Sequence, residues 1–144
     1  MSKTTRPSLP CMCASFRRVS RALTQLYDEA LRPLGLRVTQ FTVLQVLARR
    51  GEVSQGELGQ MLAMDSTTLT RTLDIMCGRG WIVKRRGKDR RERLLSLSRA
   101  GRGQLKRAIP AWEKAQAQLH SQVGEARWEE LLQLTSELTN VVTR

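Results

Sequence analysis

Residues 84–93 hold the densest group of charged side chains in this chain. The segment reads Lys-Arg-Arg-Gly-Lys-Asp-Arg-Arg-Glu-Arg, so seven of its ten side chains are cationic. A surface this rich in lysine and arginine is suited to binding the phosphates of a nucleic acid. Apolar residues flank the segment on both sides, and this pattern predicts two short strands around a turn centred on Gly87. We therefore expect a projecting cationic hairpin.

A helix with a hydroxyl-rich first half is predicted directly before the hairpin, over residues 65–76. Leu69, Leu73 and Met76 recur at helical spacing and must face the interior. The hydroxyls of residues 66–70 can then bond phosphates or base edges, because the first half of a recognition helix is the part that reaches the bases. A hydroxyl-lined helix followed at once by a cationic hairpin is the layout of a winged helix-turn-helix that binds DNA.

Asp89 is an acidic residue among the cations of the hairpin. Its position allows the carboxylate to pair with Arg91 or Arg93 and to hold the tip in one geometry. An arginine ordered in this way can enter a minor groove, where narrowing deepens the negative potential. The hairpin therefore carries cationic side chains together with an acidic residue that can hold its tip in one geometry.

The distribution of charge along the chain indicates which kind of molecule the protein binds. The chain has 25 Lys+Arg and 13 Asp+Glu, a net charge of +12. Residues 65–107 hold 13 basic and 4 acidic side chains, a net charge of +9, whereas residues 108–144 hold 3 basic and 5 acidic ones. A central cationic block indicates a polyanion partner, and a uniformly basic ribosomal-type protein would not be so uneven.

Other classes of function find little support in the composition. One histidine, no glycine-rich phosphate loop and no clustered carboxylates argue against an enzyme, and we expect neither a cofactor nor a metal. The first 18 residues contain no apolar signal segment, and no stretch is apolar enough to span a membrane. Three cysteines without a signal peptide favour reduced thiols, so we expect a cytoplasmic protein.

The remaining pattern predicts helices around the DNA-binding lobe. A helix from about residue 13 ends near Pro33 and Gly35, and Thr39 is expected to cap a second, buried helix. After Ser98 a long helix follows, in which Pro110 should produce a kink or a break. The expected fold is therefore mainly α-helical with a small β-hairpin wing.

The domain organisation follows from the apolar stripes of the helices at the two ends of the chain. Residues 1–144 are expected to form a single domain, with a winged helix-turn-helix lobe over residues 37–101. The helices in residues 11–36 and 102–144 lack an obvious partner within so small a domain. A second copy of the chain is the simplest partner for such a stripe, so we expect a homodimer.

Several motifs resemble the MarR family of bacterial winged-helix regulators. They are Gly35-Leu-Arg-Val-Thr-Gln-Phe41, Gly56-Glu-Leu-Gly-Gln-Met-Leu62, Asp65-Ser-Thr-Thr-Leu-Thr-Arg71, Gly80-Trp-Ile-Val-Lys-Arg85 and the segment from Asp89 to Gly101. The resemblance implies a homodimer on a pseudo-palindromic operator, usually as a repressor. It implies major-groove contacts from Ser66, Thr67, Thr68, Thr70 and Arg71. It also implies a wing-tip role for Arg91, with Asp89 holding it, beside Arg86, Lys88 and Arg90.

The resemblance leaves two kinds of release signal open. One is a small aromatic ligand bound between the dimerisation helices and the DNA-binding lobe. The other is thiol oxidation, because Cys13 is placed similarly to the cysteine of a peroxide-sensing branch of the family, and Cys11 could act as the resolving thiol. The chain departs from that branch at Phe41, which occupies an expected tyrosine position. Ordinary terminal thiols are the alternative for both cysteines.

The positive charge of the chain is also consistent with a second class of function. A nucleoid or RNA-binding protein that is indifferent to sequence would also be strongly basic. Aromatic residues make up 4% of the chain, which is few for a protein that stacks the bases of single strands. The preference for one duplex sequence over random DNA separates the two classes.

Overall fold

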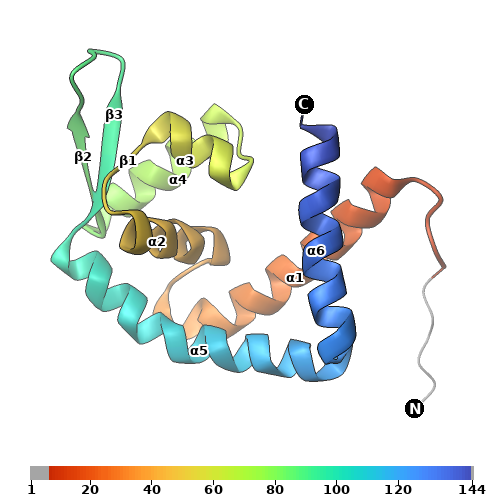
Figure 1. Cartoon of the computed structure of the whole chain (residues 1–144). Coiled ribbons are helices and arrows are strands. Elements are labelled where there is room, and N and C mark those ends of the chain that lie inside the picture. The colour runs from red at the N-terminus through yellow and green to blue at the C-terminus, as the bar shows by residue number, and fades with distance from the viewer. Residues whose placement is uncertain (1–6, 144) are drawn as a thin grey trace.

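The computed structural model describes residues 7–143, so the two ends of the single domain predicted for residues 1–144 lie outside it. Figure 1 shows a mainly helical fold with a narrow hairpin projecting at one end. In chain order the elements are α1 (Met12–Leu31), the 3-10 turn η1 (Arg32–Leu34), α2 (Val38–Arg50), β1 (Val53–Ser54), α3 (Gln55–Leu62), α4 (Ser66–Gly78), β2 (Ile82–Arg86), β3 (Arg93–Leu97), α5 (Arg99–Val123) and α6 (Glu125–Val142). The predicted fold class is confirmed.

The sheet has three antiparallel strands in the order β1-β3-β2. Strands β2 and β3 form the predicted hairpin, in a register that runs from Ile82 opposite Leu97 to Arg86 opposite Arg93. Strand β1 adds Val53 opposite Leu95 on the other edge of β3. This two-residue strand was not predicted, and it joins the segment before α3 to the middle of β3.

The core of the lobe forms where α2 and α4 pack against this sheet. Helix α2 is buried on most sides, as its sequence predicted, and its Phe41 and Leu44 are fully buried. The inward face of α4 contributes Leu69, Leu73 and Met76, as its spacing predicted. Burying side chains of this size stabilises the lobe by about 1.5–3 kcal/mol each.

The start of α2 differs from the prediction, because Thr39 does not cap it. The helix begins at Val38, with Arg37 as the capping residue. The backbone N–H of Val38 donates to Asp28 Oδ1 at 2.8 Å, and that of Arg37 donates to Gln40 Oε1 at 3.0 Å. A carboxylate on α1 therefore satisfies a donor that the helix itself leaves unpaired, and it joins the first helix to the lobe.

Helix α5 begins beside the root of the hairpin and extends along the molecule to α6 (Figure 1). It continues through Pro110 without the break that the sequence allowed. At Gly124, where φ is +91°, the chain turns into α6. Among the described helices, none combines the length and the hydropathy that crossing a membrane requires.

Candidate nucleic-acid interface

The outer face of α4 is organised by the residue that caps the helix. Asp65 accepts hydrogen bonds from the backbone N–H of Thr68 at 2.9 Å and from its hydroxyl at 2.7 Å. These bonds favour the carboxylate and hold the pKa of Asp65 below its ordinary value. The Thr68 hydroxyl is therefore used by the cap. The other predicted contact residues of this helix are exposed: Ser66, Thr67, Thr70 and Arg71.

The loop of the hairpin spans residues 87–92, so it is not centred on Gly87 as predicted. Gly87 instead begins the loop and donates its N–H to the carbonyl of Glu92 at 3.1 Å. A Cβ atom at residue 87 would overlap the Glu92 side chain. Glycine therefore lets the two sides of the loop approach each other without displacing the Glu92 side chain. The middle of the loop is at residues 89–90.

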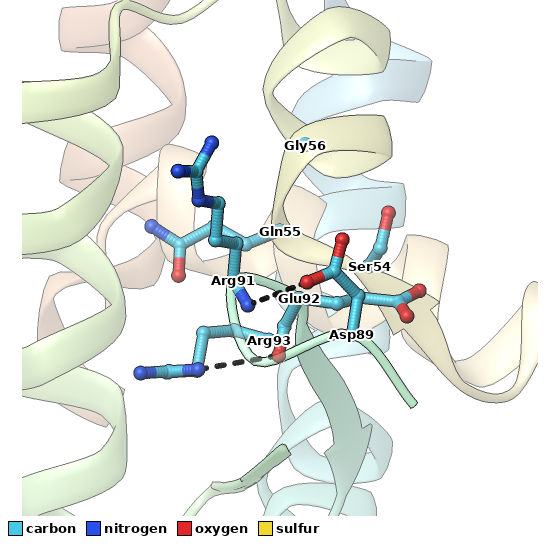
Figure 2. Close-up of a pocket in the computed structure, with 7 residues that line it drawn as sticks. All are labelled: Ser54, Gln55, Gly56, Asp89, Arg91, Glu92 and Arg93. Carbon is cyan, nitrogen blue, oxygen red and sulfur yellow. Dashed lines mark hydrogen bonds between the residues drawn. The ribbon is translucent and has the colours of Figure 1, made fainter. Parts of the chain in front are cut away.

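Asp89 holds the loop by a different bond from the one predicted. Its Oδ1 accepts from the backbone N–H of Arg91 at 3.1 Å (Figure 2). Arg93 Nη1 donates to the carbonyl of Arg90 at 2.8 Å. The sequence indicated a side-chain pair between Asp89 and one of these arginines. The carboxylate fixes the main chain instead, and within residues 7–143 the Arg91 guanidinium forms no ion pair.

Two cations of residues 84–93 form ion pairs that attach the hairpin to neighbouring segments. Arg85 forms a two-point ion pair with Glu52, in which Arg85 Nε lies 2.6 Å from Glu52 Oε2. The bonded Arg85 guanidinium lowers the pKa of Glu52. Lys84 Nζ lies 3.8 Å from Asp74 Oδ1 on α4. These pairs connect β2 to the segment before β1 and to α4, and they leave exposed cations closer to the tip: Arg86, Lys88, Arg90 and Arg91.

The hairpin loop and the start of α3 line an open pocket of about 530 Å³ (Figure 2). Its lining comes from both segments: Ser54, Gln55, Gly56, Asp89, Arg91, Glu92 and Arg93. An adjoining cavity of about 410 Å³ lies between α3 and α4, and Gln55 and Gly56 line it as well. Of the predicted contact residues, Ser66 lines the second pocket and Asp89 and Arg91 line the first, so the two adjoining pockets reach from the start of α4 to the hairpin loop.

Gln55 is a residue of this surface that the sequence analysis did not single out. Its Nε2 donates to Thr70 Oγ1 at 3.2 Å, which joins the first residue of α3 to the exposed face of α4. Ser54 caps α3 by accepting from the N–H of Glu57 at 3.1 Å. The Ser-x-x-Glu pattern of residues 54–57 is recognisable in the sequence as a helix start, and it could have directed attention to Gln55 as the residue that follows the cap.

The cysteines lie away from this surface. Cys11 and Cys13 are exposed at the start of α1, on the side of the molecule opposite the hairpin (Figure 1). Arg17 Nη2 lies 3.9 Å from Cys13 Sγ. Cys77 on α4 is half-buried, and burial raises the pKa of its thiol. Of the three thiols, the two predicted as candidate sensors are the more accessible.

Comparison with known proteins identifies a family and solved structures to which this chain is similar. The model of the MarR family matches residues 34–92, which include the helix-turn-helix segment and the hairpin loop. The Mycobacterium tuberculosis transcriptional regulator MosR, solved in complex with DNA, is 33% identical and superposes with a TM-score of 0.80, covering 93% of this chain and 99% of that one.

Two curated relatives match shorter stretches. The uncharacterised HTH-type transcriptional regulator YwoH of Bacillus subtilis is 34% identical over 56% of this chain and 58% of its own. The multiple antibiotic resistance protein MarR of Salmonella typhimurium is 35% identical over 46% of each chain. The matches therefore span about half the length of these curated relatives. MosR is 33% identical and is covered to 99% of its length, and the family model matches the helix-turn-helix and the hairpin as far as its loop, so the chain belongs to the MarR family.

Proposed function

We propose that this protein is a transcriptional regulator that binds double-stranded DNA sequence-specifically, as a homodimer on a pseudo-palindromic operator. The observation that carries the proposal is the pair of adjoining pockets that reach from Ser66 on α4, past the start of α3, to Asp89 and Arg91 of the hairpin loop, beside the exposed residues of α4. In this arrangement α4 enters the major groove and Arg91 enters the adjacent minor groove. MosR, a relative similar over nearly its whole length, has been solved with DNA. The proposal assigns the chain no enzymatic role.

The proposed division of the chain gives DNA binding to residues 37–101 and dimerisation to the helices in residues 11–36 and 102–144. Large apolar side chains are exposed along α6, among them Leu132 at 55% and Val142 at 69%. Phe16 and Val19 are exposed on α1. A second copy of the chain would cover these apolar residues, and a two-fold dimer presents two recognition helices to two half-sites one helical turn apart.

For the release signal, we propose oxidation of the N-terminal thiols. A hydroperoxide would oxidise the Cys13 thiol to a sulfenic acid and be reduced to an alcohol or water. The Cys11 thiol, in the same subunit or in its partner, would then condense with the sulfenic acid to form a disulfide and release water. The exposure of both thiols supports this order of events, because a hydroperoxide can reach them.

The alternative signal is a small aromatic ligand. A cavity of about 250 Å³ lies between the end of α1 and the start of α2, lined by Asp28, Arg32, Gly35, Leu36 and Arg37. Two arginines at its edge suit a carboxylate on an aromatic ring better than a neutral ring. Peroxide separates the two signals, because a ligand-gated regulator stays on its DNA when it is oxidised.

The test of DNA binding is fluorescence anisotropy on duplex DNA from upstream of the protein's own gene, against a scrambled duplex at the same salt concentration. We expect wild type to prefer the first by ~10³-fold. Arg91→Ala should abolish this binding and leave the dimer intact on size exclusion. Arg102→Ala, which removes an exposed arginine of α5, is the matched control and should bind as wild type does. Unchanged affinity in Arg91→Ala would contradict the proposed role of the wing.

The same assay tests the thiols. Wild type should leave its DNA after treatment with peroxide and rebind after treatment with a reductant. Cys13→Ser should stay bound in peroxide, because it cannot form the sulfenic acid. If this variant is released as completely as wild type, Cys13 is not the sensor.

A further inference from the structure

We infer that Gln55 sets the hydrogen-bonding polarity of Thr70 and thereby determines which base the recognition helix accepts. The inference rests on the DNA-binding function proposed above and goes beyond it, because it concerns which base is read at one position. Gln55 is the first residue of α3 and Thr70 lies in the middle of α4. The bond between them joins the two helices of the helix-turn-helix across its outer surface.

The direction of this bond is the central observation. Gln55 Nε2 is the donor and Thr70 Oγ1 is the acceptor, at 3.2 Å. A threonine hydroxyl has one proton to donate and two lone pairs that accept. When Gln55 occupies a lone pair, the hydroxyl proton is turned away from Gln55. Within residues 7–143 that proton has no acceptor, so Thr70 faces outward as a hydrogen-bond donor.

The neighbouring hydroxyls of α4 are used differently. The hydroxyl of Thr68 donates to Asp65 at 2.7 Å, and that of Thr72 donates to the carbonyl of Thr68 at 3.0 Å. Both protons are therefore consumed inside the helix, which is the ordinary fate of threonine hydroxyls in this setting. Thr70 differs from these two threonines, because its proton remains available to a base, and it differs from Ser66 and Thr67 because Gln55 fixes its hydroxyl. Its position between the buried Leu69 and the exposed Arg71 directs it away from the core.

Both partners of the bond are held by rigid surroundings. Gln55 directly follows β1, whose Ser54 pairs with Leu94 of β3 and also caps α3. Thr70 is held by the packing of α4 through Leu69 and Leu73, which are buried. The Thr70 hydroxyl is therefore oriented before DNA binds. Because less conformational entropy is lost on binding, the hydroxyl should distinguish more strongly between bases.

The donor polarity predicts a base preference. In the major groove, guanine offers N7 and O6 as acceptors and thymine offers O4, whereas cytosine offers only its N4 amino donor. A donating Thr70 should therefore disfavour cytosine at the base that it faces. Replacing Gln55 by glutamate should reverse the direction of the hydrogen bond. A carboxylate can only accept, so the Thr70 hydroxyl would donate its proton to it. Thr70 would then present its lone pairs to the base and accept from cytosine.

The experiment is selection of bound sequences from a random duplex library, carried out with wild type and Gln55→Glu. Gln60→Glu is the matched control, because Gln60 lines the same α3–α4 cavity and brings the same change of charge without a described bond to Thr70. We expect Gln55→Glu to gain cytosine roughly fivefold or more at one position of each half-site. The other positions, and the whole motif of Gln60→Glu, should match wild type.

Two further variants keep the inference falsifiable. Gln55→Leu removes the bond and should lose the preference at that position without gaining cytosine. The double variant Gln55→Glu with Thr70→Val should show no gain of cytosine, because the hydroxyl that reads the base is missing. A motif unchanged in Gln55→Glu, or a gain of cytosine that persists in the double variant, would overturn the inference while the proposed function stands. If wild type selects no motif, the proposed function itself fails and the inference fails with it.

Discussion

Asp89 fixes the main chain of Arg91 and does not pair with its guanidinium. The Oδ1 atom of Asp89 lies 3.1 Å from the backbone nitrogen of Arg91, and the carbonyl of Asp89 accepts from the N–H of Glu92 at 3.0 Å. The loop is therefore shaped by an acidic residue that leaves the positive charge at its tip available. A hairpin built in this way presents an ordered cation without neutralising it.

The first prediction concerns this bond. Asp89→Ala removes the acceptor and should lower the ratio of specific to non-specific DNA affinity by about two- to tenfold, the value of one hydrogen bond. Asp89→Asn keeps an acceptor at the same place and should retain the ratio. Both variants remove one negative charge, so comparing them in competition anisotropy separates geometry from charge. Equal loss in the two variants would mean that charge alone explains the role of Asp89.

The second prediction distinguishes cations that form ion pairs within the protein from cations that contact DNA. Arg85 is paired with Glu52, so the double variant Glu52→Gln with Arg85→Gln should leave the salt dependence of DNA binding unchanged. Arg90→Lys keeps the charge of another exposed cation of the loop and should do the same, whereas Arg90→Gln should reduce the slope of log affinity against log salt by about one for each arginine removed. The measurement is a salt titration of operator affinity. A reduced slope in the Glu52–Arg85 double variant would show that Arg85 contacts phosphate.

The third prediction is a pH dependence of stability at the start of α4. The pKa of Asp65 is lowered by its bonds from Thr68, so the carboxylate stabilises the folded state above its ordinary pKa. This contribution is lost as the pH falls through the lowered pKa. Asp65→Ala should therefore have a lower Tm than wild type at pH 7, and the difference should shrink towards about pH 3.

Asp65→Asn is the control for this prediction, because asparagine accepts the capping bond and does not titrate. The difference in Tm between Asp65→Asn and Asp65→Ala should be the same at every pH. If the difference between wild type and Asp65→Ala were also constant with pH, the Asp65 carboxylate would not be the titrating group.

The fourth prediction concerns the junction between the hairpin and α5. A Cβ atom on Gly101 would overlap the carbonyl oxygen of Trp81, a residue that packs at the root of the hairpin. Gly101→Ala should therefore lower the free energy of unfolding by about 3 kcal/mol, the upper end of the usual cost of overpacking. Gly78→Ala, on a helix with open space around it, should be neutral or stabilising by up to about 1 kcal/mol. Denaturant unfolding measures both.

Local patterns in the sequence predicted most of the elements. The spacing of Leu69, Leu73 and Met76 identified the buried face of α4, and the cationic run between apolar pairs identified the hairpin. These features depend on residues within one turn of helix or one pair of strands.

The features that the sequence did not reveal depend on partners far along the chain. Strand β1 exists because Val53 pairs with Leu95, and two residues have no periodicity of their own. The cap of α2 comes from Asp28 on the preceding helix, whereas Thr39 was predicted from local composition alone. The bond from Gln55 to Thr70 likewise requires the angle between two helices, which no local pattern specifies.

Sequence-specific binding can be measured by competition at one fixed salt concentration, between the best sequence selected from a random duplex library and its scrambled counterpart. We expect the selected sequence to be an inverted repeat with half-sites about ten base pairs apart and to bind two protomers. We also expect a preference for this sequence of ~10³-fold or more. Equal affinity for the selected and scrambled duplexes would show instead that the protein is a basic protein that binds nucleic acid without regard to sequence.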